Sequence, residues 1–181
     1  AILVSQDTLA YGRDLSGNGD IGDLLLALSE TPMPWVRPMY LHPAHVTERL
    51  IAKWQRARVV PYLDMPVQHG DDGILRAMRR GVTARRMLDV IARLRDAIPG
   101  VTLRTTVLVG FPGETEAAFH NLLGFVEDAG FDRLGVFTYS VEEGTPAGDM
   151  ADQVPAEVMA ERAQQVRIDA QTVAPRTCGR R

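Results

Sequence analysis

Short apolar runs rich in branched residues alternate along the chain with segments whose apolar residues recur every three or four positions. The first pattern is typical of buried strands and the second of helices with one apolar face. Their alternation indicates parallel strands joined by helical crossovers, so the predicted fold class is α/β. Both a barrel-like sheet and an open doubly wound sheet fit this pattern. The strands are predicted at Ile2–Ser5, Trp35–Leu41, Val59–Leu63, Thr102–Val109 and Arg133–Tyr139.

The segments between these strands carry signals for the starts and stops of helices. Asp20, Thr83 and Thr115 are residue types that cap helix N-termini, and Gly130 is a typical stop signal. Proline, as at position 43, suits the first turn of a helix. The helices are predicted at Ile21–Ser29, from Pro43 to Trp54, from Thr83 to Ala97, from Thr115 to Gly130 and, in a more polar segment, from Pro155 to Gln171.

Polar residues follow the predicted strands at the points where the strands end. The C-terminal ends of parallel strands meet at one edge of a sheet, and ligands of α/β folds bind there. These residues therefore predict the rim of a site. They are Gln6, Asp7 and Thr8 after the first strand, His42 after the second, Gln68 and His69 after the third, Gly110 to Glu114 after the fourth, and Tyr139 and Ser140 after the fifth.

The composition is that of one globular domain, with 181 residues, 45% of them hydrophobic and 24% charged. The formal net charge of −3 does not indicate a general nucleic-acid surface. No apolar run is long enough to cross a membrane, and the single cysteine, Cys178, makes neither a disulfide framework nor a multi-cysteine metal site. We expect a cytoplasmic protein. The arginines at 76, 79, 80, 85 and 86 favour a solvated helical face over a patch for an acidic partner such as RNA.

The sequence alone allows both a functional and a structural interpretation of several rim residues. The glycines of Gly110 to Glu114 let a backbone approach a ligand, but they equally suit a tight turn, and the Walker Lys-Ser/Thr pair is missing. Asp7 and Glu114 suit an acid–base pair, or a ligand contact and a helix N-terminal charge. A lone histidine such as His69 usually has no functional role, but its place beside Gln68 at a strand end favours a base, a ligand or a substrate contact. Arg104 lies within an apolar strand, where its charge needs a partner or a site unless it points to the surface.

Five motifs in order, the first of them in two parts, carry a resemblance to a known family. They are VSQDT at residues 4–8 with YGRDL at 11–15, WVRPMY at 35–40, YLDMPVQH at 62–69, LRTTVLVGFPGET at 103–115 and FTYSVEEGTPA at 137–147. The chain resembles the radical-SAM methylthiotransferases, and among them the RimO type that modifies an aspartate of ribosomal protein uS12. The tRNA-modifying MiaB type shares GFPGET and GTPA but differs near Gln6, after Gln68 and near Glu142.

The resemblance implies a partial (β/α) radical-SAM barrel that lacks its first βα unit and binds S-adenosyl-L-methionine at the strand C-terminal ends. We expect a barrel core at residues 1–154, a C-terminal helix at 155–171 towards an absent TRAM domain, and an atypical tail at 172–181. By resemblance, the cofactor-binding residues are Gln6 and Asp7 at the methionine end, Gln68 and His69 facing the cavity, Arg104 and Gly110 beside the cofactor, and Phe137 and Tyr139 near the adenine. No catalytic residue and no metal ligand is assigned.

The family uses two 4Fe-4S clusters, and the cysteines that would hold them are absent from this chain. The resemblance therefore implies the central part of a transferase that is active as the full-length parent, and we expect this segment alone to be inactive. Its partners would be uS12, on or near the ribosome, and S-adenosylmethionine, with no membrane. The alternatives are a tRNA methylthiotransferase and a non-catalytic α/β binding module without clusters.

Overall fold

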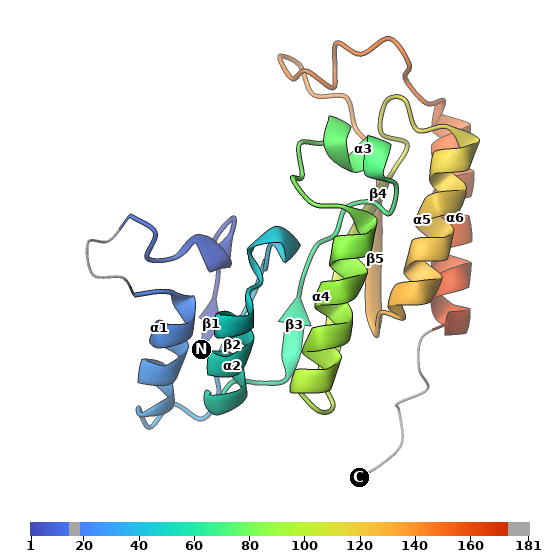
Figure 1. Ribbon diagram of the computed structural model, residues 1–181. Coiled ribbons are helices and arrows are strands. Elements are labelled where there is room, and N and C mark those ends of the chain that lie inside the picture. Colours follow the sequence, from blue (N-terminus) through green and yellow to red (C-terminus); the bar gives the residue numbers. More distant parts are fainter. Residues whose placement is uncertain (15–18, 174–181) are drawn as a thin grey trace.

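The structure is a computed structural model that describes residues 1–14 and 19–173 (Figure 1). Neighbouring strands are parallel, with β1 beside β2 in one group and β4 between β3 and β5 in the other. An isolated parallel bridge between Val36 and Val59 joins the two groups next to β2 and β3. The strands are β1 (Ile2–Leu3), β2 (Arg37–Pro38), β3 (Tyr62–Asp64), β4 (Thr102–Val109) and β5 (Arg133–Thr138).

The strands follow one another in space in the same order as in the sequence. A doubly wound sheet reverses its strand order at a switch point, whereas a (β/α) barrel does not. The predicted α/β class with parallel strands is confirmed, and the order favours the barrel-like alternative.

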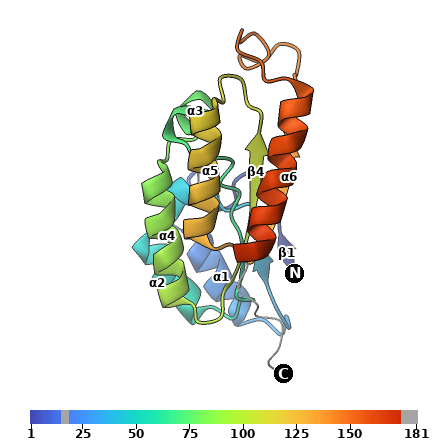
Figure 2. The ribbon, with the colours of Figure 1, turned by 90° about the vertical axis from the view of Figure 1, so that its right-hand side faces the viewer.

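Helices cover one face of the strands. In the view of Figure 2, α4 and α5 lie to one side of β4 and α6 to the other, and α6 packs against β5 and α5. Along β4 the burial alternates, so that Leu103, Thr105, Val107 and Val109 face the helices. The helices are α1 (Ile21–Ser29), α2 (Glu48–Arg56), α3 (Asp72–Ala77), α4 (Ala84–Ala97), α5 (Glu116–Ala129) and α6 (Ala156–Val173), with 3-10 turns at η1 (Thr8–Ala10) and η2 (Pro43–His45).

The core lies between the strands and these helices. Its fully buried side chains include Leu25 of α1, Leu63 of β3, Met87 of α4, Leu103 of β4 and Leu122 of α5. A smaller apolar cluster around Ile74, Phe111 and Ala118 lies at the C-terminal end of β4. No described helix is long and apolar enough to cross a membrane.

The first two strands are shorter than predicted. Tyr40 has a φ of 56°, in the left-handed region, so the extended backbone of β2 cannot continue to Leu41. The predicted start of the third strand at Val59 is also wrong, because Pro61 lacks the backbone N–H that a ladder needs, and β3 begins only at Tyr62.

The helix predictions were right for α1 and for the Thr83 and Thr115 caps, whose hydroxyls accept from Arg86 N and Ala118 N. The segment from Pro43 to Trp54 is not one helix, because Val46 and Thr47 are extended and Thr47 caps α2 through Leu50 N. Helix α3 was missed. Asp71 starts it by accepting from two backbone N–H groups.

The last predicted helix, from Pro155 to Gln171, is present as α6. The division at residues 154 and 155 stays a prediction. In the predicted tail, residues 174–181, with Cys178, lie outside the described residues.

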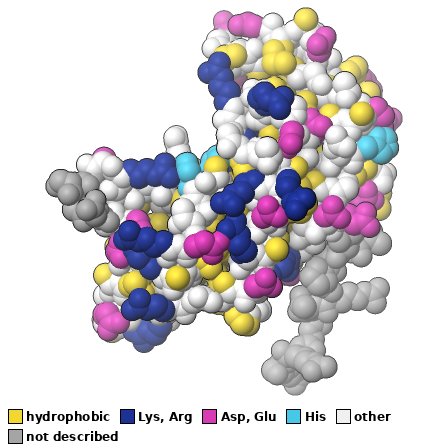
Figure 3. Space-filling model, viewed as in Figure 1, with side chains coloured by type: hydrophobic (Ala, Val, Ile, Leu, Met, Phe, Trp, Pro, Cys, Tyr) yellow, Lys and Arg dark blue, Asp and Glu magenta, His cyan; other side chains and the backbone are white. Residues whose placement is uncertain are grey.

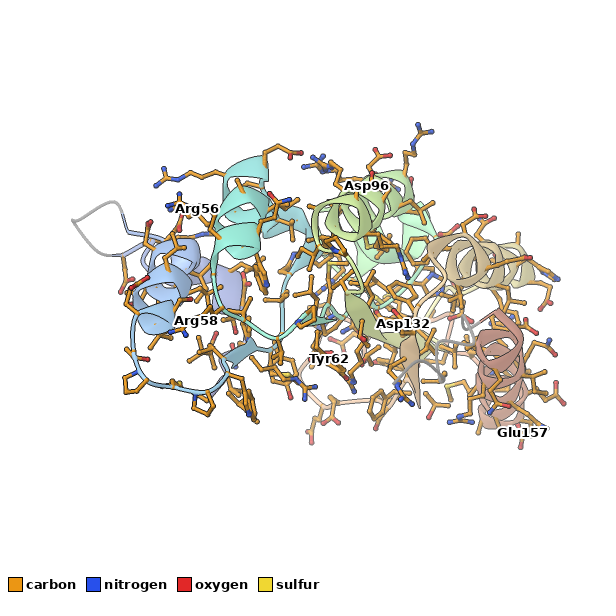
Figure 4. The ribbon with its side chains drawn as sticks, turned by 90° about the horizontal axis from the view of Figure 1, so that it is seen from below. Arg56, Arg58, Tyr62, Asp96, Asp132 and Glu157 are labelled. Carbon is orange, nitrogen blue, oxygen red and sulfur yellow. The ribbon has the colours of Figure 1, made fainter. Side chains whose placement is uncertain are left out.

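The strand face turned away from the helices is polar. Tyr62, Asp64, Arg104 and Thr106 occupy alternate positions that project to this side. Figure 4 shows Tyr62 on this side of the strands and Asp96 on the helix side. This polar concave face is where the site lies.

Candidate ligand site

A cavity of about 340 Å³ opens at the C-terminal ends of the strands. Its walls come from every strand or from the segment that follows it, as expected of a ligand site in a (β/α) barrel. The size lies at the low end of the range for small-molecule sites. The lining residues are Gln6 after β1; Tyr40, Leu41 and His42 after β2; Pro66, Gln68 and Arg80 after β3; Arg104 and Thr106 of β4; and Phe137 of β5.

Gln68 enters the cavity from a constrained backbone. Its φ is 72°, a left-handed value that glutamine rarely adopts. Two hydrogen bonds to β4 hold this conformation, since Gln68 N donates to Thr106 O at 3.0 Å and Gln68 O accepts from Leu108 N at 2.8 Å. The turn sends the Gln68 side chain to the cavity and the next side chain, His69, into the core.

Arg104 is the charged strand residue for which a partner was expected. It projects to the concave face, and its Nη1 donates to Asp64 Oδ1 at 2.5 Å on the neighbouring strand. The Asp64 side chain is fully buried, and its Oδ2 has no hydrogen-bond partner among the described residues. This bond to Asp64 raises the pKa of Arg104, although burial opposes the rise. Arg104 is both paired and part of the cavity wall.

Arg80 is a second cation of the cavity, and the sequence reading missed it by placing it on a solvated face. Its Nη2 donates to Pro66 O at 2.8 Å, while its buried Nε has no hydrogen-bond partner in the described part of the chain. Burial lowers the pKa of Arg80, and the charge of Asp7 opposes this. Its charge is thus only partly compensated, which favours an anionic ligand group.

The remaining arginines of that cluster do lie on the surface. Arg76, Arg79, Arg85 and Arg86 are exposed, as predicted for a solvated face. Figure 3 shows basic side chains over α3 and α4, with acidic ones among them. One signal could have separated Arg80 from its neighbours. Arg80 immediately precedes Gly81, which has a φ of 63° in the turn after α3.

His42 is a neutral wall residue. Its pKa is lowered from 6.5 to about 4, first by burial and then by the charges of Arg80 and His45. Its Nδ1 accepts from Ala44 N at 3.2 Å, which starts η2. His42 is therefore uncharged at neutral pH, and the positive charges at the cavity wall are those of Arg80 and Arg104.

Two aromatic side chains provide apolar surface. Phe137 and Tyr40 line the cavity and are 59% and 43% exposed. Exposed rings beside polar groups are suited to stacking on a flat ligand.

Four predicted site residues lie outside the cavity wall. Asp7 caps η1 through Leu9 N and lies 2.5 Å from His45 Nδ1. His69 is fully buried, and Gly110 N donates to the Glu114 carboxylate at 2.7 Å. Tyr139 packs edge-on against Phe111. The structure therefore brings Gln6, Gln68, Arg104 and Phe137 together at the cavity and places the other four residues behind or beside it.

Among the described residues, no group of three or more His, Cys, Asp or Glu side chains could hold a metal ion. The described donor set therefore does not fit an iron–sulfur cluster, which needs several thiolates. Cys178 lies outside the described residues.

Residues 8–126 match the family model described as the Radical SAM superfamily. The chain is 52% identical over 162 residues to "Ribosomal protein uS12 methylthiotransferase RimO" of Anaeromyxobacter sp., an alignment that covers 88% of this chain and 34% of that relative. It is 46% identical over 176 residues to the protein of the same name in Microcystis aeruginosa, with 97% of this chain and 40% of the relative covered. The chain thus spans between a third and two fifths of the length of these curated relatives. The resemblance inferred from the motifs is confirmed.

One solved structure supports the fold. It is described as "Coproporphyrinogen III oxidase (HemN) from Escherichia coli is a Radical SAM enzyme". The TM-score is 0.66 at 17% sequence identity, over 77% of this chain and 32% of that chain. At this identity the likeness shows the fold alone.

Proposed function

Because the chain belongs to the radical SAM superfamily, we propose that it forms the S-adenosylmethionine-binding central part of a methylthiotransferase. The target of the whole enzyme would be an aspartate of ribosomal protein uS12, to which it adds a methylthio group at the β-carbon. One observation carries this proposal, namely 52% identity over 88% of the chain to a protein named for that activity. A uS12 methylthiotransferase would act in the cytoplasm, on or near the ribosome.

The cavity fits the chemical groups of S-adenosylmethionine. Arg80 lines the cavity with a charge that Asp7 only partly compensates, and this charge suits a carboxylate at the methionine end. The amide of Gln68 and the hydroxyl of Thr106 line the same cavity and suit the ribose hydroxyls. The exposed ring of Phe137 offers a face for the adenine.

In this proposal the chain's own residues bind and orient the cofactor. Arg80 holds the carboxylate, Gln68 the ribose and Phe137 the adenine. Arg104 places a positive charge at the cavity wall. Its ion pair with Asp64 compensates this charge when no ligand is bound. Gln6 lies at the same wall, in the place that the family resemblance gives to the methionine end.

The other predicted site residues act from behind this wall. Asp7 fixes η1, which follows Gln6, and its charge also acts on Arg80. His69 and Gly110 meet at Glu114, and Tyr139 supports the end of β5. We propose supporting roles for these four residues.

When bound, S-adenosylmethionine supplies the adenosyl group for the radical reaction and the methyl group for transfer. The iron–sulfur clusters of such an enzyme do not fit the described residues. We propose that their ligands belong to the part of the relatives' length that this chain does not span.

The first experiment measures binding of S-adenosylmethionine to the 181-residue chain by isothermal titration calorimetry. We expect one site, with weaker binding in Phe137→Ala because the stacking surface is lost. Trp35→Ala is the matched control, since Trp35 is an exposed aromatic residue that does not line the cavity. Absence of binding, or an equal loss in both variants, would refute the assignment of this cavity.

The second experiment tests the reaction. This chain replaces the matching segment of the Anaeromyxobacter relative, the clusters are reconstituted, and uS12 and tRNA are offered as separate substrates. Mass spectrometry should find a methylthio group on an aspartate of uS12 and none on tRNA. Modification of tRNA alone would favour the MiaB-type alternative, and modification of neither by a hybrid with intact clusters would favour a binding module.

A further inference from the structure

Three segments that are far apart in the sequence meet at a buried carboxylate behind the cavity. Glu114 precedes α5, His69 follows β3, and Arg162 belongs to α6. The side chains of Glu114 and His69 are 0% exposed and that of Arg162 is 9% exposed. A buried group of this kind adds little to stability compared with apolar packing, so its presence calls for another reason.

Glu114 is the centre of this group. Its Oε1 accepts from Arg162 Nη1 at 2.8 Å, and its Oε2 accepts from Gly110 N at 2.7 Å. The same Nη1 also donates to Glu114 O at 2.9 Å, so Arg162 holds both the side chain and the backbone. The Nη2 of Arg162 reaches Glu116 at 3.1 Å. Helix α6 is thus attached to the turn at the end of β4.

The third member, His69, is oriented from both sides of its ring. Its Nδ1 accepts from Asp71 N at 2.9 Å, so in the neutral ring the proton is on Nε2. This Nε2 lies 3.3 Å from Glu114 Oε2. Among the described residues Nε2 makes no hydrogen bond, so its N–H side meets the carboxylate as a close polar contact, while the bond from Asp71 N and full burial limit the rotation of the ring.

The fixed ring matters because His69 directly follows Gln68. The left-handed backbone of Gln68 carries local strain, and such a conformation persists only when its surroundings hold it. With His69 anchored in the core and Gln68 bonded to β4, the Gln68 side chain is directed to the cavity.

We propose that Arg162 is a positioning residue for the cofactor cavity. Arg162 fixes Glu114 by hydrogen bonds. Glu114 in turn accepts from Gly110 N at the end of β4 and lies against the ring of His69, and β4 and His69 together orient Gln68. The docking of α6 is thereby coupled to the shape of the cavity, although α6 contributes no residue to its wall. This inference rests on the proposed function, since it names how that same cavity is kept in its binding shape.

The test is Arg162→Met, which keeps the length of the side chain but removes its donors. The Kd for S-adenosylmethionine should rise roughly tenfold, because coupling through packed networks changes binding by amounts of that order. Calorimetry separates a misplaced Gln68 from partial unfolding. A misplaced Gln68 raises the Kd, whereas unfolded chains lower the measured number of binding sites per chain. The side-chain amide resonance of Gln68 should also shift in the free protein.

The matched control is Arg95→Met. Arg95 donates to Gly130 O at 2.5 Å, at the C-terminus of α5 and away from the cavity. It should lower the melting temperature and leave both the Kd and the Gln68 resonance unchanged. If Arg162→Met does not fold, Arg162→Lys serves instead, because lysine keeps the charge but cannot hold the side chain and backbone of Glu114 in the same way.

A Kd within twofold of the parent chain, with an unchanged Gln68 resonance, would overturn the positioning role. Failure of the parent chain itself to bind S-adenosylmethionine would instead refute the proposed function. In that case the Gln68 resonance still decides whether the network holds this side chain.

Discussion

Replacing Arg80 by glutamine tests the charge of the cavity most directly. The substitution removes the guanidinium and keeps a polar side chain that can still donate towards Pro66 O, which accepts from Arg80 at 2.8 Å. It also leaves His42 and Arg104, the other groups near this charge, in place. The backbone is undisturbed, because the left-handed residues of this loop are Arg79 and Gly81 and not Arg80.

The expected loss follows from one charge-assisted hydrogen bond. Bonds of this type contribute about 1.5–3 kcal/mol. Arg80 is only half-buried, so solvent screening favours the lower end of this range. A loss of about 1.5 kcal/mol corresponds to a Kd for S-adenosylmethionine that is roughly ten times higher.

The assay is isothermal titration calorimetry with two ligands, S-adenosylmethionine and its decarboxylated analogue. Arg80→Gln should weaken binding of the first and leave binding of the second nearly unchanged, because the analogue has no carboxylate for Arg80 to hold. Arg79→Gln is the control, since Arg79 is the exposed neighbour. An equal loss for both ligands, or no loss for either, would refute the assignment of Arg80 to the carboxylate.

Two further predictions concern stability. Because the pKa of His42 falls from 6.5 to about 4 on folding, the unfolded chain binds a proton that the folded chain does not, and stability should decrease as the pH falls from about 6.5 towards 4. NMR titration should show the His42 ring neutral above pH 5 in the native protein. Arg80→Gln should raise the pKa of His42, because it removes a nearby positive charge. A titration midpoint near 6.5 in the native protein would contradict the prediction. Gly70→Ala should destabilise the fold by about 1–3 kcal/mol, because its new Cβ would lie 2.5 Å from Phe125 Cβ. Gly124→Ala, with open space around the new Cβ, should stabilise α5 by roughly 1 kcal/mol in urea unfolding, and the reasoning fails if the two glycine variants behave alike.

The sequence alone was enough for the elements with strong local signals. Strand β4 has a clear alternation of buried positions, and the helices α1, α4 and α5 each have an apolar face and a capping residue. These four elements were predicted with their observed limits or within one residue of them. Strand β2 was predicted too long at its C-terminal end because the left-handed Tyr40 interrupts the segment, and its parallel neighbour β1 is also shorter than predicted. Helix α3 was missed because it is short and its cap, Asp71, stands in a segment with few apolar residues.

The site was predicted as an edge of the sheet and only partly as a set of side chains. Gln6 and Gln68, predicted at strand ends, and Arg104 and Phe137, assigned by resemblance, line the cavity, and their binding of the cofactor stays a prediction. Apart from its place directly before Gly81, nothing in the sequence pattern separates Arg80 from the surface arginines beside it. Its place depends on the turn after α3 and on the packing of that turn against Pro66.

The motif order and the apolar periods thus determined the α/β class, the parallel strands and the family, because these depend on residues close together in the chain. The tertiary structure decided which of two adjacent residues faces the ligand. Gln68 points to the cavity and His69 to the core because the left-handed backbone of Gln68, hydrogen-bonded to β4, turns one side chain away from the other. Such an arrangement depends on contacts between distant segments, and so no local pattern could contain it.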